Sequence, residues 1–141
     1  MIIRCNVCNN NKIVPVSENK REFRIQNKSG CKINKVTVDG CYITSGLKCD
    51  YLFEIIKTDV EEVYYVELKG SDISHGRKQL ESTIKYCNSE HRSVFKKEAY
   101  IVASKFKSPK SSTSSQKLKR EFKRVNNIPL FIYTKQIEVT V

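Results

Sequence analysis

The stretch Val63-Tyr64-Tyr65-Val66-Glu67-Leu68-Lys69-Gly70 has the composition of an apolar strand, yet it ends in two charges separated by one residue. Side chains alternate between the two faces of a strand, so Glu67 and Lys69 project from the same face. Charged side chains are rarely buried unless they are paired or bind a metal. The end of this strand is therefore the first candidate for a functional site.

The residues before this strand predict two more strands. Residues 35–43 are rich in β-branched and aromatic side chains, and residues 48–56 follow them after a Ser-Gly turn. Three consecutive strands with short connections predict an antiparallel meander, in which the start of the second strand lies beside the end of the third. Asp50 is therefore expected on the same sheet face as Glu67 and Lys69.

A helix and a further strand are predicted after the meander. Asp72 can cap a helix over residues 73–87, and Gln79 lies on the shoulder of its buried face, within reach of the charged strand end. The apolar run at residues 99–104 predicts an interior strand, reached from the meander by a β-helix-β crossover. The apolar stripe of the predicted helix consists of Leu80, Ile84 and Cys87.

The ends of the chain carry weaker patterns. Residues 17–27 are ambiguous, since Ser17 could cap a short helix while Phe23 and Ile25 alternate as in a strand, and we favour the helix. An amphipathic helix is expected over residues 116–125. Residues 128–133 and 137–141 have strand composition and predict a closing hairpin. The inward side chains of the second helix are expected to be Leu118, Phe122 and Val125.

These elements predict an α/β fold. Its centre is a mixed β-sheet, made of the antiparallel three-stranded meander, the crossover helix and further strands, and it is flanked by helices. A chain of 141 residues is long enough for one domain with its own core, so residues 1–141 are expected to be a single domain. Within it, residues 1–16 are expected to form an N-terminal extension and residues 105–116 a basic flexible loop.

The composition favours a polyanionic partner. Lys plus Arg outnumber Asp plus Glu by 26 to 15, a formal net charge of +11, and such a field attracts nucleic acid. A solvated surface without a partner is the alternative. No run of about 18 apolar residues is present, and no secretory signal opens the chain, so we expect an intracellular, cytoplasmic protein without a membrane span. The candidate nucleic-acid contacts are Lys105, Lys107, Lys110, Lys117, Lys119, Arg120, Lys123 and Arg124.

The cysteines offer a candidate zinc site. Cys5 and Cys8 have the spacing of half a tetrahedral site, but zinc needs two more ligands and no second tight pair follows. The alternative is that both are small, unligated thiols, and for an intracellular chain we expect all six cysteines to be reduced.

The charges at the strand end suit the hydrolysis of a phosphodiester. Asp50, Glu67 and the backbone carbonyl of Leu68 offer hard oxygen ligands to Mg²⁺ or Mn²⁺. A bound metal would lower the pKa of a water, while Lys69 orients that water or stabilises the developing negative charge. Gln79 would hydrogen-bond to the nucleophile or to one of the groups that surround the metal. The alternative is an exposed strand-end pair, which would contribute only about 0.2 to 1 kcal/mol.

Three short segments resemble the motif of the PD-(D/E)xK nuclease superfamily. They are Cys49-Asp50, Glu67-Leu68-Lys69 and Gln79-Leu80, and the resemblance spans residues 36–104. It implies a restriction-endonuclease-like core in which Asp50, Glu67 and Lys69 are the metal-binding and catalytic residues, with Gln79 as the helix glutamine of the exonuclease-like branch.

The chain departs from that family pattern in places. Cys49 stands where a proline is usual, and Thr83 stands where the exonuclease-like branch has a tyrosine, with Tyr86 three residues later. The family commonly carries an acidic residue on its first helix, for which Glu22 is the candidate, while Glu18 lies on the same face of the helix expected at residues 17–27.

The expected function is therefore a small metal-dependent nuclease acting on DNA. It could be structure-selective or belong to a phage-defence or restriction system, and a homodimer or a partner protein would supply target recognition. The competing class is a non-catalytic nucleic-acid-binding protein, either a zinc-stabilised module or an inactive nuclease fold. A cysteine-based enzyme is disfavoured, because no signature places a histidine near a thiol.

Overall fold

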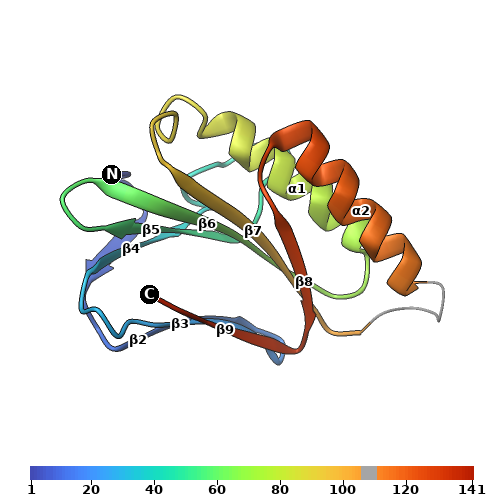
Figure 1. Ribbon diagram of the computed structural model, residues 1–141, viewed down its shortest axis with the longest axis horizontal. Coiled ribbons are helices and arrows are strands. Elements are labelled where there is room, and N and C mark those ends of the chain that lie inside the picture. The colour runs from blue at the N-terminus through green and yellow to red at the C-terminus, as the bar shows by residue number, and fades with distance from the viewer. Residues whose placement is uncertain (106–110) are drawn as a thin grey trace.

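A computed structural model describes residues 1–105 and 111–141 of the chain. The fold is mixed α/β and has three layers, with two helices on one face of a larger sheet and a smaller sheet on its other face (Figure 1). The helices are α1 (Ile73–Tyr86) and α2 (Ser111–Asn126). The smaller sheet has the order β2 (Ile13–Glu18), β3 (Arg21–Gln26) and β9 (Gln136–Thr140). The larger sheet has the order β1 (Asn6–Asn9), β4 (Lys32–Thr37), β5 (Tyr51–Ile56), β6 (Val60–Lys69), β7 (Lys96–Ala103) and β8 (Leu130–Thr134).

The predicted meander and crossover are confirmed. Strands β4, β5 and β6 pair antiparallel in sequence order, and α1 connects β6 to its parallel neighbour β7. Strand β8 also runs parallel to β7, so the carboxyl ends of β6, β7 and β8 meet at one edge of the sheet. The first predicted strand is shorter than expected, because β4 ends at Thr37.

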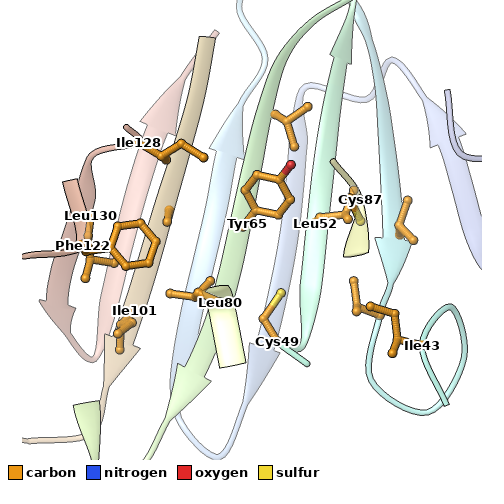
Figure 2. Packing of buried hydrophobic residues seen from close by; sticks show 14 of the residues in the cluster. Ile43, Cys49, Leu52, Tyr65, Leu80, Cys87, Ile101, Phe122, Ile128 and Leu130 are labelled. Carbon is orange, nitrogen blue, oxygen red and sulfur yellow. The ribbon is translucent and has the colours of Figure 1, made fainter. Parts of the chain in front are cut away.

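Two apolar layers cover the two faces of the larger sheet. On the helix side, Leu80 and Phe122 of the two helices pack over Leu52, Tyr65 and Ile101 of the strands (Figure 2). On the other side, Phe23 and Ile25 of the smaller sheet pack against Phe53, Tyr64 and Val102 of the larger one. Both faces of β6 are therefore covered, and that explains its nearly continuous apolar sequence. Its terminal charges have to fit into the same buried surroundings.

The first 16 residues are part of both sheets, which differs from the predicted extension. Strand β1 pairs with β4 at the edge of the larger sheet, and β2 pairs with β3 in the smaller one. Ile2 is buried, and its N–H donates to the Glu54 carboxylate at 2.9 Å. These partners are far away in sequence, so no local pattern indicates them.

The helix predicted at residues 17–27 is wrong. This segment is a hairpin whose turn has Asn19 and Lys20 at positive φ, and β3 buries every second residue. The alternation of Phe23 and Ile25 is thus a strand pattern, and it outweighs the helix-capping signal of Ser17.

The closing hairpin is also wrong. Strand β8 pairs with β7 in the larger sheet, whereas β9 pairs with β3 in the smaller one. The chain passes from one sheet to the other at Lys135, whose φ is 68°. A tight turn between two apolar runs favours a hairpin locally. Here the first run instead pairs with the edge of β7 in the larger sheet, and the second pairs with the edge of β3 in the smaller sheet.

Helix α2 begins earlier than predicted. It starts at Ser111, so residues 111–116 of the predicted flexible loop are helical, while residues 106–110 lie outside the described part of the chain. Phe122 is fully buried and Leu118 packs against the core, but Val125 is exposed, contrary to the prediction. No helix in the described residues is long and apolar enough to cross a membrane.

A disulfide overturns the zinc hypothesis. Cys5 is bonded to Cys41, with 5.8 Å between the two Cα atoms, and Cys8 is an exposed free thiol on β1. Strand β1 runs extended from Asn6, so Cys5 and Cys8 are not joined by the tight loop that a zinc pair needs. The expectation that all cysteines are reduced is wrong for Cys5 and Cys41.

Candidate metal centre at the carboxyl end of β6

Asp50 and Glu67 meet at the end of the meander. Tyr51 pairs with Val66 in the β5–β6 register, which sets Asp50 opposite Glu67 on the side covered by α1. One oxygen of Asp50, Oδ2, accepts a hydrogen bond of 2.8 Å from the Leu68 N–H. The two carboxyl groups also interact with each other, and this interaction raises the pKa of Glu67. Together they form a pair of oxygen ligands at the carboxyl end of β6.

Burial makes this pair hold a proton. Glu67 is only 2 % exposed, and its Oε1 has no hydrogen-bond partner. Burial, and then the charge of Asp50, raise the pKa of Glu67 to about 9. The pKa of Asp50 is raised as well, mainly by burial, and the Leu68 N–H partly offsets this. The pair therefore carries less negative charge at neutral pH than two free carboxylates would.

Lys69 lies on the same face and is held by Gln79. The Lys69 Nζ donates to Gln79 Oε1 at 2.9 Å, and Gln79 Nε2 donates to the carbonyl of Lys48 at 3.1 Å. Among the described residues, Lys69 forms no ion pair with Asp50 or Glu67. The positive charge of Lys69 still lowers the pKa of Glu67. Gln79 thus fixes the direction of the Lys69 side chain from α1.

Thr83 is a positioning residue that the sequence analysis did not assign. Its Oγ1 accepts a hydrogen bond of 2.8 Å from the Cys49 N–H and donates to the Gln79 carbonyl at 3.1 Å. Gln79 and Thr83 therefore hold Lys48 and Cys49, the two residues that precede Asp50. A polar residue inside the apolar stripe of α1 was the available signal for this role.

Gly76 lets α1 approach the carboxylate pair. A Cβ added at Gly76 would lie 3.3 Å from Ile101 Cδ1 and 3.6 Å from Glu67 Cγ. Even a methyl group there would require the end of the Ile101 side chain to move by a few tenths of an ångström. The close approach of α1 excludes water from Glu67, and that exclusion accounts for its burial.

The Leu68 carbonyl can join the two carboxylates. The N–H and C=O of one strand residue point to the same side, and the Leu68 N–H points to Asp50. The site thus offers two carboxylates and one carbonyl, a donor set that suits Mg²⁺ or Mn²⁺ with water and phosphate oxygens as further ligands. Among the described residues, no group of three or more His, Cys, Asp or Glu side chains gathers around a metal position.

The acidic candidate from the first segment lies elsewhere. Glu22 is on the outer face of the smaller sheet and pairs with Arg24 at 3.1 Å, so the structure does not bring it to the carboxylates. Glu18, at the hairpin turn, lies closer to Asp50 than Glu22 does, and its charge raises the pKa of Asp50. A helix over residues 17–27 would place Glu18 and Glu22 on one face, whereas in the hairpin they lie on opposite faces of the smaller sheet.

The basic residues lie mostly on α2, beside α1. An ion pair of 2.9 Å between Arg77 and Glu121 joins the two helices and uses the one acid of the basic segment. Lys107 and Lys110 lie outside the described residues, and Lys119 is half-buried. The exposed members of the predicted contact set are Lys105, Lys117, Arg120, Lys123 and Arg124.

A second buried carboxylate occupies the other end of the same sheet face. Glu54 Oε1 accepts from the Ile2 N–H at 2.9 Å and from Asn34 Nδ2 at 2.7 Å, and Oε2 is 2.7 Å from His91 Nε2. His91 Nδ1 is in turn 2.7 Å from the Tyr65 hydroxyl. Burial alone would raise the pKa of Glu54, but its hydrogen bonds outweigh that effect and lower it. We call these four side chains and the Ile2 N–H the Glu54 network.

Comparison with protein-family models, curated proteins and solved structures finds no match for this chain.

Proposed function

We propose that this chain is a metal-dependent nuclease of the PD-(D/E)xK superfamily that hydrolyses phosphodiester bonds in DNA. The observation that carries the proposal is Glu67, a carboxyl group that is 2 % exposed, has an unpartnered Oε1 and faces a second carboxyl group. Such an arrangement is unfavourable in an unliganded core, and a divalent cation would satisfy it. The antiparallel meander, crossover helix and parallel β7 support the restriction-endonuclease-like core.

The residues divide the work as follows. Asp50, Glu67 and the Leu68 carbonyl would hold Mg²⁺ or Mn²⁺, which when bound polarises the phosphate and lowers the pKa of a water ligand. Gln79 holds the Lys69 ammonium at the end of β6, where it orients the attacking water or stabilises negative charge on the phosphate. Thr83 keeps the backbone before Asp50 in place.

The basic surface of α2 supports DNA as the substrate class. Its exposed cations would bind phosphates without reading bases, so binding should weaken strongly as salt rises. Target recognition would then come from a homodimer or from a partner protein, as in a structure-selective enzyme or a restriction system.

A cleavage assay tests the proposal. Supercoiled plasmid and branched DNA are incubated with Mg²⁺, with Mn²⁺ and with EDTA. Wild-type protein should cut only with metal, and Lys69→Ala should cut about 100-fold more slowly, as expected for the loss of a group that stabilises the transition state. Lys78→Ala is the matched control, because Lys78 is exposed on α1 next to Gln79. Cutting by Lys69→Ala at the wild-type rate would contradict the proposed role of Lys69.

The same assay addresses the competing function. Salt-dependent DNA binding without cleavage under any metal would instead identify a non-catalytic nucleic-acid-binding protein with an inactive nuclease fold. A zinc site built on Cys5 and Cys8 is not supported for that alternative, since Cys5 is bonded to Cys41.

A further inference from the structure

Two tight turns enclose a pocket at the carboxyl edge of the larger sheet. One is the β2–β3 turn at Asn19 and Lys20, and the other is the link between β8 and β9 at Lys135. We call the space between them the turn pocket. Its volume is about 690 Å³, and it is lined by residues 17–22 and 134–136.

Arg21 lines this pocket and is buried without an ion pair, although Glu18 stands opposite it in the β2–β3 register. It is the first residue of β3, shares the inward face with Phe23 and Ile25, and is only 8 % exposed. Its Nη1 donates to Ser104 Oγ at 2.9 Å, whereas its buried Nε has no acceptor. No Asp or Glu of the described residues forms an ion pair with it, and the sequence of residues 106–110 contains neither.

The next arginine on the strand shows what is unusual about Arg21. Arg24 points to the outer face of β3, where it pairs with Glu22 at 3.1 Å and Glu138 at 3.5 Å. Arg24 thus pairs with two carboxylates although it is more exposed than Arg21, which forms no ion pair with the described Asp and Glu residues. Burying a cation is costly unless an anion compensates it, and a guanidinium cannot escape the cost by losing its proton.

The turn pocket lies beside the end of β6, just past the residues that carry the carboxylate pair. The Arg21 guanidinium lies against Gly70, since a Cβ built there would be 3.7 Å from Nη1. Ser104, which holds Arg21, donates its own N–H to the carbonyls of Lys69 and Gly70 at 3.1 and 2.8 Å. One side of the strand end therefore presents the Lys69 ammonium, and the other presents Arg21.

The charges around the turn pocket also favour an anion. Lys20 and Lys135 are exposed, one on each turn. Of the two acids in the lining, Glu22 is paired with Arg24, and Glu18 lies near enough to Asp50 to raise its pKa. The three cations of the lining, Lys20, Arg21 and Lys135, thus outnumber Glu18, the acid of the lining that forms no ion pair among the described residues.

We infer that Arg21 binds a phosphate group of the nucleic-acid substrate, next to the phosphate that is cut at Asp50 and Glu67. This inference rests on the proposed nuclease function. A planar guanidinium with free N–H groups matches phosphate oxygens, and the two lysines add attraction at longer range. The phosphate is either an internal phosphodiester of the bound strand or a terminal phosphate, and the two sources share the same chemistry.

Binding without cleavage tests the inference. The affinity of the protein for a fluorescein-labelled DNA strand is measured by anisotropy in EDTA over a range of salt concentrations. Arg21→Met should weaken binding by about tenfold or more and lower the salt slope by about one, as for one lost phosphate contact. Arg24→Met is the matched control from the same strand and should stay within about twofold of wild type.

Parallel arms separate the two sources of phosphate. Strands with a 5′-phosphate, a 3′-phosphate or only hydroxyl ends are compared. A loss in Arg21→Met that is equal for all strands identifies an internal phosphodiester, and a loss confined to phosphorylated ends identifies a terminal phosphate. Arg21→Met that binds every strand as tightly as wild type would overturn the inference.

A second variant separates the loss of the phosphate contact from a loss of the fold. Arg21→Lys keeps the charge but loses the planar fork, so it should bind several-fold more weakly than wild type while keeping the circular dichroism spectrum of the native fold. In thermal melts, inorganic phosphate should raise the Tm of wild type and of Arg24→Met but not that of Arg21→Lys. Equal phosphate responses and equal DNA affinities of Arg21→Lys and wild type would refute the role of the guanidinium.

The inference and the proposed function fail in different ways. If wild type never cuts DNA but Arg21→Met loses binding and one unit of salt slope, the phosphate site stands and the nuclease proposal falls. If wild type cuts with Mg²⁺ and Arg21→Met binds and cuts equally well, the nuclease proposal stands and the phosphate site falls.

Discussion

Glu54 and Glu67 are two buried carboxyl groups on the same face of the same sheet, and the fold treats them in opposite ways. Glu54 is 0 % exposed, accepts hydrogen bonds from Ile2, Asn34 and His91, and has a lowered pKa. Glu67 is 2 % exposed, has an oxygen without a partner, and has a pKa raised to about 9. The chain can evidently satisfy a buried carboxylate, and the unsatisfied one at Glu67 is the observation on which the proposed metal site rests.

Their places in the fold explain the difference. Glu54 lies opposite Val63 in the middle of the β5–β6 pairing, where the N-terminal segment and the residues after α1 close over it. Glu67 lies beyond the last paired residue of β5, at the carboxyl edge of the parallel strands. Ligands of α/β proteins commonly bind outside the carboxyl ends of strands. Glu54 therefore holds the fold together, and Glu67 is the proposed functional group.

The largest effect on stability is expected from breaking the Glu54 network. Glu54→Ala leaves His91, Asn34 and the Ile2 N–H without their acceptor inside the core and should lower the free energy of unfolding by about 3 to 5 kcal/mol. Urea denaturation measures the loss. Glu61→Ala on neighbouring β6 is the control, because Glu61 is exposed, and it should change stability by less than about 0.5 kcal/mol. Similar losses in both variants would mean that the network is not a stabilising element.

Removing the charge of Glu67 should raise the free energy of unfolding, in contrast to the loss expected for Glu54→Ala, and the effect should depend on pH. The pKa of Glu67 is about 9 in the folded protein and 4.5 as its ordinary value, so its contribution to stability is complete below pH 4.5 and is lost as pH rises towards 9. Glu67→Gln should therefore stabilise the metal-free protein at pH 8, by at most about 1.4 kcal/mol for each pH unit above 4.5.

The contrast with Glu54 makes the pH experiment specific. The pKa of Glu54 is lowered, so its contribution is complete above pH 4.5 and is lost as pH falls through the folded pKa. Chemical denaturation at several pH values in EDTA should show the alkaline slope disappear in Glu67→Gln and the acid slope disappear in Glu54→Gln. Mg²⁺ should raise the Tm of wild type but not of Glu67→Gln. An alkaline slope that is unchanged in Glu67→Gln would show that Glu67 is not the group responsible.

The smallest effect is expected from Thr83. Thr83→Val preserves the shape of the side chain but leaves the Cys49 N–H without its acceptor, at a cost of about 1 to 2 kcal/mol. Because Thr83 holds the backbone before Asp50, the affinity for Mn²⁺ should fall severalfold as well, which isothermal titration calorimetry would detect. Thr44→Val, at an exposed position, provides the comparison. Unchanged Mn²⁺ affinity in Thr83→Val would restrict Thr83 to a purely structural role.

Local sequence patterns could predict the meander, the crossover helix α1 and the approach of Asp50 to Glu67, because each depends on neighbours in sequence. Gln79 could be found by its helical spacing. Thr83 gave a weaker signal, as a polar residue inside an apolar stripe, and Glu54 gave a similar one, since it interrupts the apolar face of β5 and therefore needs partners.

Long-range pairing could not be predicted in this way. His91 lies in a polar connection with no motif, and only the fold brings it to Glu54. The same holds for the bond between Cys5 and Cys41 and for the exposed face of Arg24, as opposed to the buried face of Arg21. The hairpin at residues 17–27 likewise depends on its pairing with β9 and its packing on the larger sheet, so a local pattern predicts neither the burial of Arg21 nor the position of Glu18.

The turn at Lys135 also has a consequence for how the protein is made. Because β9 pairs with β3, the smaller sheet contains one strand from near the start of the chain and another that the ribosome produces more than a hundred residues later. Until Thr140 has emerged, one edge of β3 has no partner, and the apolar side chains of β3 are shielded only in part. The turn pocket is completed by the same event, so a nascent chain would acquire Arg21 in its final surroundings only after the rest of the proposed catalytic centre has been synthesised.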